Sequence, residues 1–224
     1  MIEFIFMLTH HDRTVPHAEQ VLTDVADTGL RLVGCKDVGA TPQRLRDLVT
    51  RAHDHGLEMM LEVVSTSRDD ELTSVRAAAD AGFDWVLGGT HAADAAALLT
   101  GSGIRYCPFP GTIVGHPSVL QGEIDQIARS AAELTALDGV HGVDLLAYRH
   151  PTADAGALTA AVVAASAGPV IAAGSVVDTA QIDTLAAAGA WGFTIGGAIF
   201  EGRLPGGPDI AAQVRAVLAV AAEA

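Results

Sequence analysis

The sequence predicts a single (β/α)8 TIM barrel that spans residues 1–224. Short apolar runs alternate with Ala/Leu/Val-rich stretches of helical periodicity, and this alternation occurs eight times. The length of 224 residues is close to the usual barrel size of about 250. The main alternative is a doubly wound open sheet. That fold normally has a glycine-rich nucleotide-binding turn after its first strand, whereas this chain has Thr9-His10-His11-Asp12-Arg13 there.

The eight apolar runs are the predicted strands, in chain order 3–8, 31–35, 58–64, 85–87, 104–107, 143–147, 170–173 and 192–195. Predicted helices follow them at 16–28, 42–55, 69–81, 92–100, 118–136, 154–167, 178–188 and 208–222. A short extra helix is predicted directly after the eighth strand, within residues 196–200.

Capping residues support these boundaries. Thr41 before Pro42, Ser67 before three acidic residues, and Asp178 before Thr179 are typical helix starts. Glycines are expected to cap helix ends before the next strand, at Gly56, Gly82, Gly103, Gly168 and Gly189.

Composition excludes several classes of protein. The chain is 50% hydrophobic and 18% charged, which excludes intrinsic disorder. No uncharged apolar run approaches the roughly 18 residues of a membrane span, and no signal-peptide pattern is present, so we expect a cytoplasmic protein. Two cysteines, Cys35 and Cys107, provide neither a disulfide framework nor a cysteine-rich zinc site. The net charge of −14 argues against nucleic acid as a partner but permits a small anionic ligand.

Lys36 is the only lysine among 13 Lys and Arg residues, and it ends the predicted second strand. An amine can lose its proton when desolvated, whereas a guanidinium stays charged. In a (β/α)8 barrel, loops that follow the strands form the catalytic face. Five histidines are also predicted on this face, at positions 10, 11, 91, 116 and 150. The lysine is therefore a catalytic candidate, against the alternative that it is an ordinary surface residue.

Lys36 and Glu62 are predicted to meet at the barrel mouth. If Lys36 points inward, the two-residue period places Gly34 inside as well, where it would leave space for a ligand. Glu62 shares its alternation with Met60 on the next strand. Three interpretations remain open: an acid–base pair, a Schiff-base lysine acting on a ketose or keto acid, and a structural buried ion pair.

The first loop offers His10 or His11 as a general acid–base group, because imidazole titrates near neutrality. Neighbouring residues on an extended segment point to opposite sides, so we expect at most one of the two to face the pocket. Asp12 and His91 are substrate-binding candidates. A first-loop histidine, Asp12, His91 and Glu62 together offer ligands for a divalent metal, but no metal-binding motif supports this, and we expect neither metal nor cofactor.

Further substrate-binding candidates follow the first and sixth strands. Arg149 is suited to binding a carboxylate or phosphate, and Tyr148 to orienting a hydroxyl or carbonyl group. The alternative is a loop in which His150 caps the next helix. Arg13 and Arg203 are weaker cationic candidates.

The loops after the seventh and eighth strands predict a phosphate site. Gly174, Ser175, Gly196 and Gly197 would let backbone N–H groups approach an oxyanion, as these loops do in many barrels. The alternative is that the glycines serve only tight turns and packing.

Residues 169–203, with Val170-Ile171-Ala172, Gly174 and Gly196-Gly197-Ala198-Ile199, resemble the C-terminal part of the ribulose-phosphate-binding barrel superfamily, and within it the N-acetylmannosamine-6-phosphate 2-epimerases. The resemblance covers about one-sixth of the chain. It implies a (β/α)8 barrel in which a lysine and an acid transfer protons on a phosphorylated sugar. That group typically has an acid just before the glycine of the seventh strand, where this chain has Ala173.

The longest interval between strands contains residues 108–117. Its prolines and glycines suit a lid over the pocket, whereas Phe109, Ile113 and Val114 equally suit an oligomer contact. A homodimer is the commonest assembly for such a protein.

The leading functional hypothesis is an isomerase or epimerase that transfers a proton next to a carbonyl group of a small phosphorylated sugar. The alternatives are a Schiff-base aldolase that uses Lys36 and a non-catalytic barrel that binds a phosphorylated or carboxylated metabolite.

Overall fold

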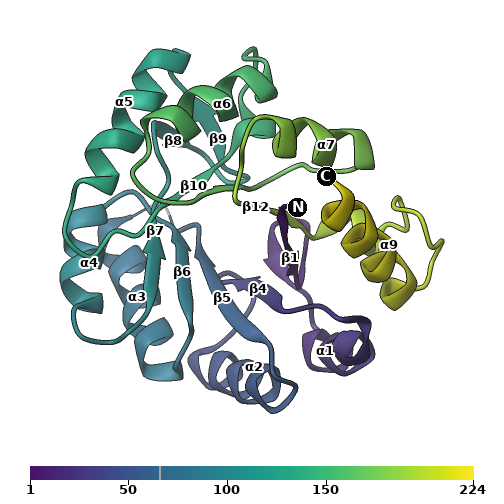
Figure 1. Cartoon of the computed structure of the whole chain (residues 1–224). Coiled ribbons are helices and arrows are strands. Elements are labelled where there is room, and N and C mark those ends of the chain that lie inside the picture. Colours follow the sequence, from purple (N-terminus) through teal and green to yellow (C-terminus); the bar gives the residue numbers. More distant parts are fainter. Residues whose placement is uncertain (66) are drawn as a thin grey trace.

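Eight parallel strands stand side by side in chain order in the computed structural model, which describes residues 1–65 and 67–224 (Figure 1). They are β1 (Glu3–Met7), β4 (Leu32–Lys36), β5 (Glu58–Val63), β6 (Trp85–Gly88), β7 (Arg105–Cys107), β10 (Val143–Leu145), β11 (Val170–Ala172) and β12 (Gly192–Ile195). Hydrogen bonds from His141 N to Tyr106 O (2.8 Å) and from Asp144 N to Pro108 O (2.9 Å) join β7 to β10 and complete the ring. The predicted (β/α)8 barrel is confirmed.

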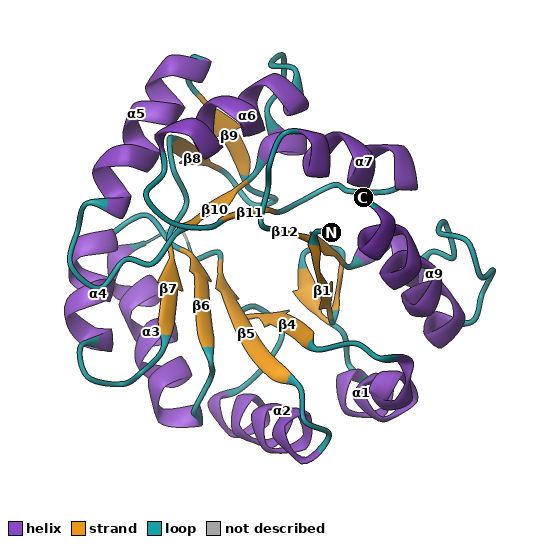
Figure 2. Cartoon of the chain, viewed as in Figure 1, coloured by secondary structure: helices purple, strands orange, loops and turns teal. Residues whose placement is uncertain are grey.

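Helices surround the ring of strands (Figure 2). They are α1 (Ala18–Val25), α2 (Pro42–Asp54), α3 (Arg68–Ala81), α4 (Ala92–Leu99), α5 (Ile124–Thr135), α6 (Ala155–Ala165), α7 (Thr179–Ala187), α8 (Gly197–Phe200) and α9 (Ile210–Glu223), with 3-10 turns η1 (Ala26–Thr28) and η2 (Ala147–Arg149). The extra helix predicted after the eighth strand is α8. No helix in the described part of the chain has the length and apolarity needed to cross a membrane.

The predicted helix starts are confirmed, and two predicted ends are wrong: α4 ends at Leu99 with Thr100 as its cap, so Gly103 lies beyond the helix end, and Gly168 does not cap a helix either. The side chains of Thr41, Ser67 and Asp178 accept hydrogen bonds from the first turns of α2, α3 and α7. Gly82 ends α3 with a left-handed φ of 80°. Gly168 is not a cap: a Cβ there would lie 1.9 Å from His141 O, so this glycine permits two backbone segments to approach each other.

The alternation along the strands directs side chains to two different cores. Val33 and Leu61 pack in the cluster shared with the helices, whereas Leu32 and Met60 pack in the barrel interior. Lys36 and Glu62 have the same parity as Leu32 and Met60 and are paired in register across β4 and β5. The predicted inward direction of both residues is therefore confirmed.

The space expected beside Gly34 is filled. A Cβ at Gly34 would lie 2.5 Å from Met7 Sδ, so the methionine of β1 occupies the room that we assigned to a ligand. The glycine serves core packing, and ligand space has to be found above it, toward the barrel mouth.

The predicted helix at 118–136 starts later than expected. Residues 112–121 form an antiparallel hairpin of β8 (Thr112–Val114) and β9 (Val119–Gln121), and α5 begins at Ile124 after a capping box between Glu123 and Gln126. The β-branched residues of this segment favour a strand, and short apolar runs do not distinguish strand from helix. Phe109 is buried inside the chain and is therefore not exposed for an oligomer contact.

The two ends of the chain lie on one side of the barrel, where Ile2 N donates to Ala221 O at 3.0 Å (Figure 1).

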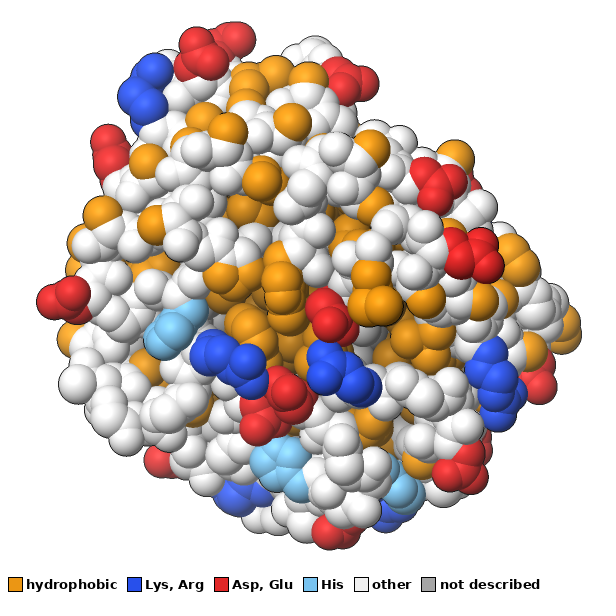
Figure 3. All heavy atoms as spheres, viewed as in Figure 1, with side chains coloured by type: hydrophobic (Ala, Val, Ile, Leu, Met, Phe, Trp, Pro, Cys, Tyr) orange, Lys and Arg blue, Asp and Glu red, His pale blue; other side chains and the backbone are white. Residues whose placement is uncertain are grey.

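Figure 3 shows the face seen in Figure 1: hydrophobic side chains occupy its centre, with basic and acidic side chains beside them. At the strand-start end, the Trp85 and Trp191 rings pack with centroids 5.4 Å apart and planes tilted by 34°, and the Arg105 guanidinium lies 3.9 Å over the Trp85 ring. The aromatic pair closes this end of the interior.

Candidate functional site

A cavity of about 580 Å³ opens where the strands end, and we call it the main cavity. Its walls come from the segments after β1, β4, β5, β10, β11 and β12, together with the β8–β9 hairpin. Its charged and histidine lining consists of His10, His11, Asp12, Lys36, Glu62, Arg149, Glu201 and Arg203. The cavity lies on the face that carries the active site in (β/α)8 barrels.

Lys36 forms the floor of the main cavity and is 4% exposed. Its Nζ donates a short hydrogen bond to Asp12 Oδ1 and lies 3.5 Å from Glu62 Oε1. Arg149 holds Asp12 from the other side, with Nη2 2.8 Å from Oδ1 and Nη1 2.9 Å from Oδ2. The four side chains form one buried charged cluster.

Asp12 is an anion in this cluster. Burial by itself would raise the pKa of its carboxyl, but the hydrogen bonds from Arg149 and the charge of Lys36 outweigh burial and hold the pKa well below its ordinary value. Both carboxylate oxygens are already bonded to cations. Asp12 therefore positions Lys36, a role that differs from the substrate contact expected from the sequence.

A tight hairpin brings Asp12 over the barrel. Thr9–His10 (β2) pairs with Arg13–Thr14 (β3), and the two central residues of the turn, His11 and Asp12, have φ of 49° and 57°. Positive φ at both central positions defines a type I′ turn, which usually takes glycine or asparagine.

Ser175 has φ of 61°, and the non-glycine residues with positive φ in the described chain, Ser175, His11 and Asp12, all line the main cavity. Strained backbone that gathers at one cavity is typical of a functional site.

The turn also overturns the expectation that only one of the first-loop histidines faces the pocket. Both His10 and His11 line the main cavity, with ring centroids 3.8 Å apart. The reason is that His11 is in the left-handed region and not extended. His10 Nε2 lies 3.2 Å from Glu201 Oε1, and Arg203 Nη1 lies 3.7 Å from Glu201 Oε2. Glu201, at the rim, is therefore contacted from two sides.

The glycines of the predicted phosphate site have different local roles. A Cβ at Gly174 would lie 2.5 Å from Arg149 Nε, and one at Gly196 would lie 2.6 Å from Thr9 Oγ1, so both make room for neighbouring residues. Gly197 is freer, since its Cβ would come no closer than 3.7 Å to His10. All three, with Ser175, line the main cavity. Packing therefore explains Gly174 and Gly196, and Gly197 and Ser175 are the better candidates to face a ligand.

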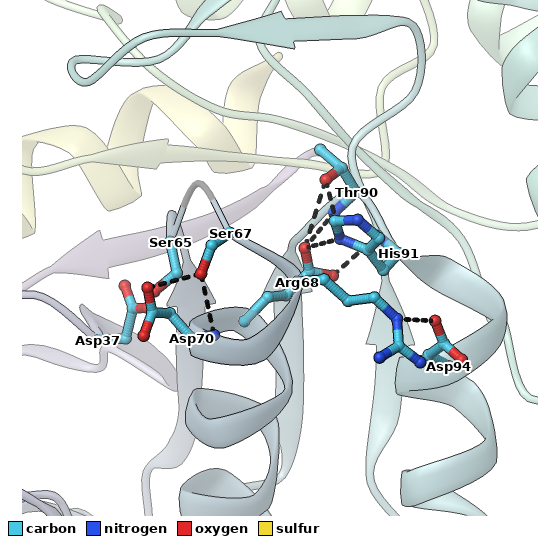
Figure 4. A network of polar contacts seen from close by, with 9 residues as sticks. Asp37, Ser65, Ser67, Arg68, Asp70, Thr90, His91 and Asp94 are labelled. Carbon is cyan, nitrogen blue, oxygen red and sulfur yellow. Dashed lines mark hydrogen bonds and ion pairs between the residues drawn. The ribbon is translucent and has the colours of Figure 1, made fainter.

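Two candidates do not line the main cavity. Arg13 is exposed on β3. His91 Nδ1 lies 2.8 Å from Oε2 of the fully buried Glu71, which also accepts from Thr90 N at 3.0 Å (Figure 4). His91 thus belongs to a network that fixes the loop after β6. Figure 4 also shows Arg68 paired with Asp94 next to this network.

Tyr148 and Arg149, both in η2, line the main cavity. The Tyr148 hydroxyl donates to Gln181 O at 3.4 Å. His150 Nδ1 accepts from Thr152 N and Ala153 N and so fixes the loop before α6. The cap of α6 itself is Asp154, whose side chain accepts from Ala157 N, so the helix cap expected at residues 150–152 lies further along the chain.

Asp144 is a buried acid that the sequence reasoning did not select. Its neighbours Val143 and Leu145 pack outward, so the Asp144 side chain lies inside the barrel, where it is 0% exposed and makes no hydrogen bond with any described residue. Burial, followed by the charge of Glu62, raises the pKa of Asp144 well above its ordinary value. The sequence feature that could have pointed to Asp144 is a charged residue within an otherwise apolar predicted strand.

The described residues contain no group of three or more His, Cys, Asp or Glu side chains arranged to hold a metal ion. Of the ligands considered for such a site, the first-loop histidines, Asp12 and Glu62 line the main cavity, whereas His91 is bonded to Glu71 outside it.

Comparison with solved structures shows the same fold. A protein described as native KDPGal has a TM-score of 0.69 at 19% identity, covering 98% of this chain and 94% of that chain. Orotidine 5'-phosphate decarboxylase from Pyrococcus horikoshii OT3 has a TM-score of 0.68 at 14% identity, covering 98% and 99%. N-acetylmannosamine-6-phosphate 2-epimerase from Clostridium perfringens has a TM-score of 0.63 at 12% identity, covering 88% and 86%.

These matches cover 88% to 98% of the chain, so the (β/α)8 fold that the resemblance of residues 169–203 implied is confirmed. Identities this low establish the fold alone. No protein-family model and no curated protein matches the sequence.

Proposed function

We propose that the protein is an isomerase or epimerase that transfers a proton next to a carbonyl group of a small phosphorylated sugar. The observation that carries the proposal is the buried Lys36, set between Asp12 and Glu62 at the floor of the main cavity. An amine and a carboxylate within 3.5 Å of each other suit proton transfer to and from one carbon and its carbonyl oxygen.

Each residue has a distinct part in this proposal. Glu62 takes the proton from the carbon beside the carbonyl, and the Lys36 ammonium donates a hydrogen bond to the oxygen on which negative charge develops. Asp12 and Arg149 fix the position of Lys36. Return of the proton to the neighbouring carbon, with transfer of the hydroxyl proton from the first carbon's oxygen to the former carbonyl oxygen, gives an isomer. Return of the proton to the other face of the same carbon gives an epimer. His10 and His11 stand on the cavity wall within the same loop and assist this return.

The phosphate is assigned to the segments after β11 and β12, where Ser175 and Gly197 line the main cavity. Glu201 lines the same cavity and is paired with His10 and Arg203. Two structural neighbours named for phosphorylated compounds, orotidine 5'-phosphate decarboxylase and N-acetylmannosamine-6-phosphate 2-epimerase, support this substrate class.

Deuterium exchange tests the proposal. Phosphorylated ketoses and aldoses of three to six carbons are incubated with the protein in D2O, and proton NMR records loss of the signal beside the carbonyl. We expect Lys36→Arg and Glu62→Gln to slow exchange at least about 100-fold, the usual scale for removing an acid–base group. Arg31→Gln is the matched charge-removing control, because Arg31 is exposed and pairs with Glu3 at the start of β1.

Two further measurements separate the other hypotheses from the proposed isomerase. A lysine adduct trapped at Lys36 by borohydride with dihydroxyacetone phosphate would establish the Schiff-base alternative. Binding of phosphorylated sugars without exchange, and retained by Lys36→Arg, would establish a non-catalytic binding protein. Either result would refute the proposed isomerase.

A further inference from the structure

A second cavity of about 290 Å³ lies beside the main cavity, beneath the β8–β9 hairpin. Its apolar walls are Val63 and Val64 from the end of β5, Phe109 after β7, and Ile113 and Val114 from β8. Charged side chains, which dominate the main cavity, do not line this one in the described part of the chain. The two cavities therefore offer a ligand opposite chemistry.

The two cavities share a wall. Ser118, at the turn of the hairpin, lines both, and its carbonyl oxygen accepts from Arg149 Nη1 at 3.4 Å. On β5, Glu62 lines the main cavity and Val63 the second, from opposite sides of the strand, so the hairpin at Ser118 is what the two cavities have in common. A molecule that reaches Ser118 from the main cavity thus lies next to the apolar space.

Two of the three hydroxyl-bearing residues that line the second cavity are already engaged, and the third, Ser118, lies on the wall shared with the main cavity. Ser65 Oγ donates to Asp37 Oδ2 at 2.5 Å, and Thr90 Oγ1 donates to Glu71 Oε2 at 3.3 Å; both residues are drawn in Figure 4. Because these donors are used within the protein, the cavity offers mainly hydrocarbon surface to a ligand. An engineered apolar cavity of about 150 Å³ in another protein binds benzene, so about 290 Å³ has room for a ring or a chain of several carbons.

We propose that the second cavity binds an uncharged apolar substituent of the same molecule whose phosphate is held in the main cavity. The inference rests on the proposed function and narrows its substrate class: the phosphorylated compound carries an alkyl, acyl or aryl group in addition to its polar carbons. A plain sugar phosphate would leave the apolar walls unused.

Calorimetric titration with a homologous series tests this inference. Inorganic phosphate and the monoalkyl phosphates from methyl to hexyl are titrated into the full-length protein. We expect affinity to rise about fourfold for each methylene group that becomes buried and then to level off when the cavity is full. Inorganic phosphate gives the affinity of the anion site alone.

A matched pair of variants localises the effect. Val114→Glu places a charge in the apolar lining and should abolish the dependence on chain length, while inorganic phosphate binds as before. Leu137→Glu is the control, because Leu137 is 39% exposed against 38% for Val114 and lies outside both cavities. It should leave the whole series unchanged.

Failures of the two proposals are distinguishable. If inorganic phosphate binds and the series is flat, or if Val114→Glu keeps the chain-length dependence, the apolar subsite is overturned while the phosphate site stands. If no phosphate compound binds, the proposed function is overturned. Binding of 1-butanol, followed by methyl NMR, then tests the second cavity alone. Methyl NMR shifts at Val63 and Ile113 would support it, and their absence would overturn it.

Discussion

Replacing Asp144 with asparagine tests whether the barrel holds a neutral carboxylic acid in its interior. In the unfolded chain the pKa of this carboxyl is about 3.9. In the folded protein, burial and the charge of Glu62 raise the pKa well above that value. Between the two pKa values the folded protein retains a proton that the unfolded chain has released. The free energy of unfolding therefore falls as pH rises, by up to about 1.4 kcal/mol per pH unit.

Asp144→Asn removes this pH dependence. The asparagine amide would be buried without partners, as the carboxyl oxygens are now, at a cost of about 1–3 kcal/mol that is the same at every pH. Urea denaturation of both proteins from pH 4.5 to 9 gives the difference in unfolding free energy. We expect the unfolding free energy of wild type to fall relative to that of the variant as pH rises. The fall ends once the pH exceeds the pKa of Asp144 in the folded protein.

The exposed Asp138 provides the control, since Asp138→Asn should give a difference that varies little with pH. A flat difference between wild type and Asp144→Asn across this range would show that Asp144 is already ionised in the folded protein, and would refute the reasoning.

Three further predictions concern the cluster, the thiols and a helix cap. Arg149→Met should lower the free energy of unfolding by about 3–5 kcal/mol in urea denaturation, because it leaves Asp12 buried beside fewer cations, and the double variant with Asp12→Asn should recover part of the loss. Burial raises the pKa of the Cys35 thiol to about 12 and that of the Cys107 thiol further. A thiol-specific disulfide reagent at pH 8 should therefore label neither cysteine until the protein unfolds. Rapid labelling of the native protein would contradict this. Ser67→Ala should cost about 1 kcal/mol in thermal denaturation, because the side chain caps α3; an unchanged melting temperature would show that the cap is dispensable.

The strands and the direction of their side chains were predictable because they depend on local pattern. Strands buried on both sides are short apolar runs bounded by glycine and polar residues, and these runs match β1, β4 and β5 to within one or two residues. The parity of Lys36 and Glu62 follows from the two-residue period once the strands are placed.

The partners of Lys36 were not predictable in the same way. Asp12 reaches Lys36 because a turn with two left-handed residues folds back over the barrel, and His11-Asp12 is not the glycine or asparagine sequence that signals such a turn. The bidentate contact from Arg149 joins positions 137 residues apart. Long-range contacts of this kind depend on the closed ring and leave no trace in local sequence.

The hairpin and the buried Asp144 were not predicted from the sequence, for a further reason. Residues 112–121 contain apolar runs too short to distinguish strand from helix, and their pairing is settled by contact with the barrel. Asp144 contradicts the apolar pattern of its own strand, and a buried acid of this kind shows its importance only when its surroundings are known.

The ring of strands has one joint that differs from the others. Around the described barrel, β7 and β10 are neighbours without a continuous β-ladder, and the chain beyond β7 contains Pro108 and Pro110, which have no amide hydrogen to extend one. Asp144 lies on this joint through its own backbone bond to Pro108. Alkaline conditions that charge the buried acid should thus open the barrel locally at this joint first. Amide hydrogen exchange at His141 and Asp144 should then become faster before exchange does at the β4–β5 ladder on the far side.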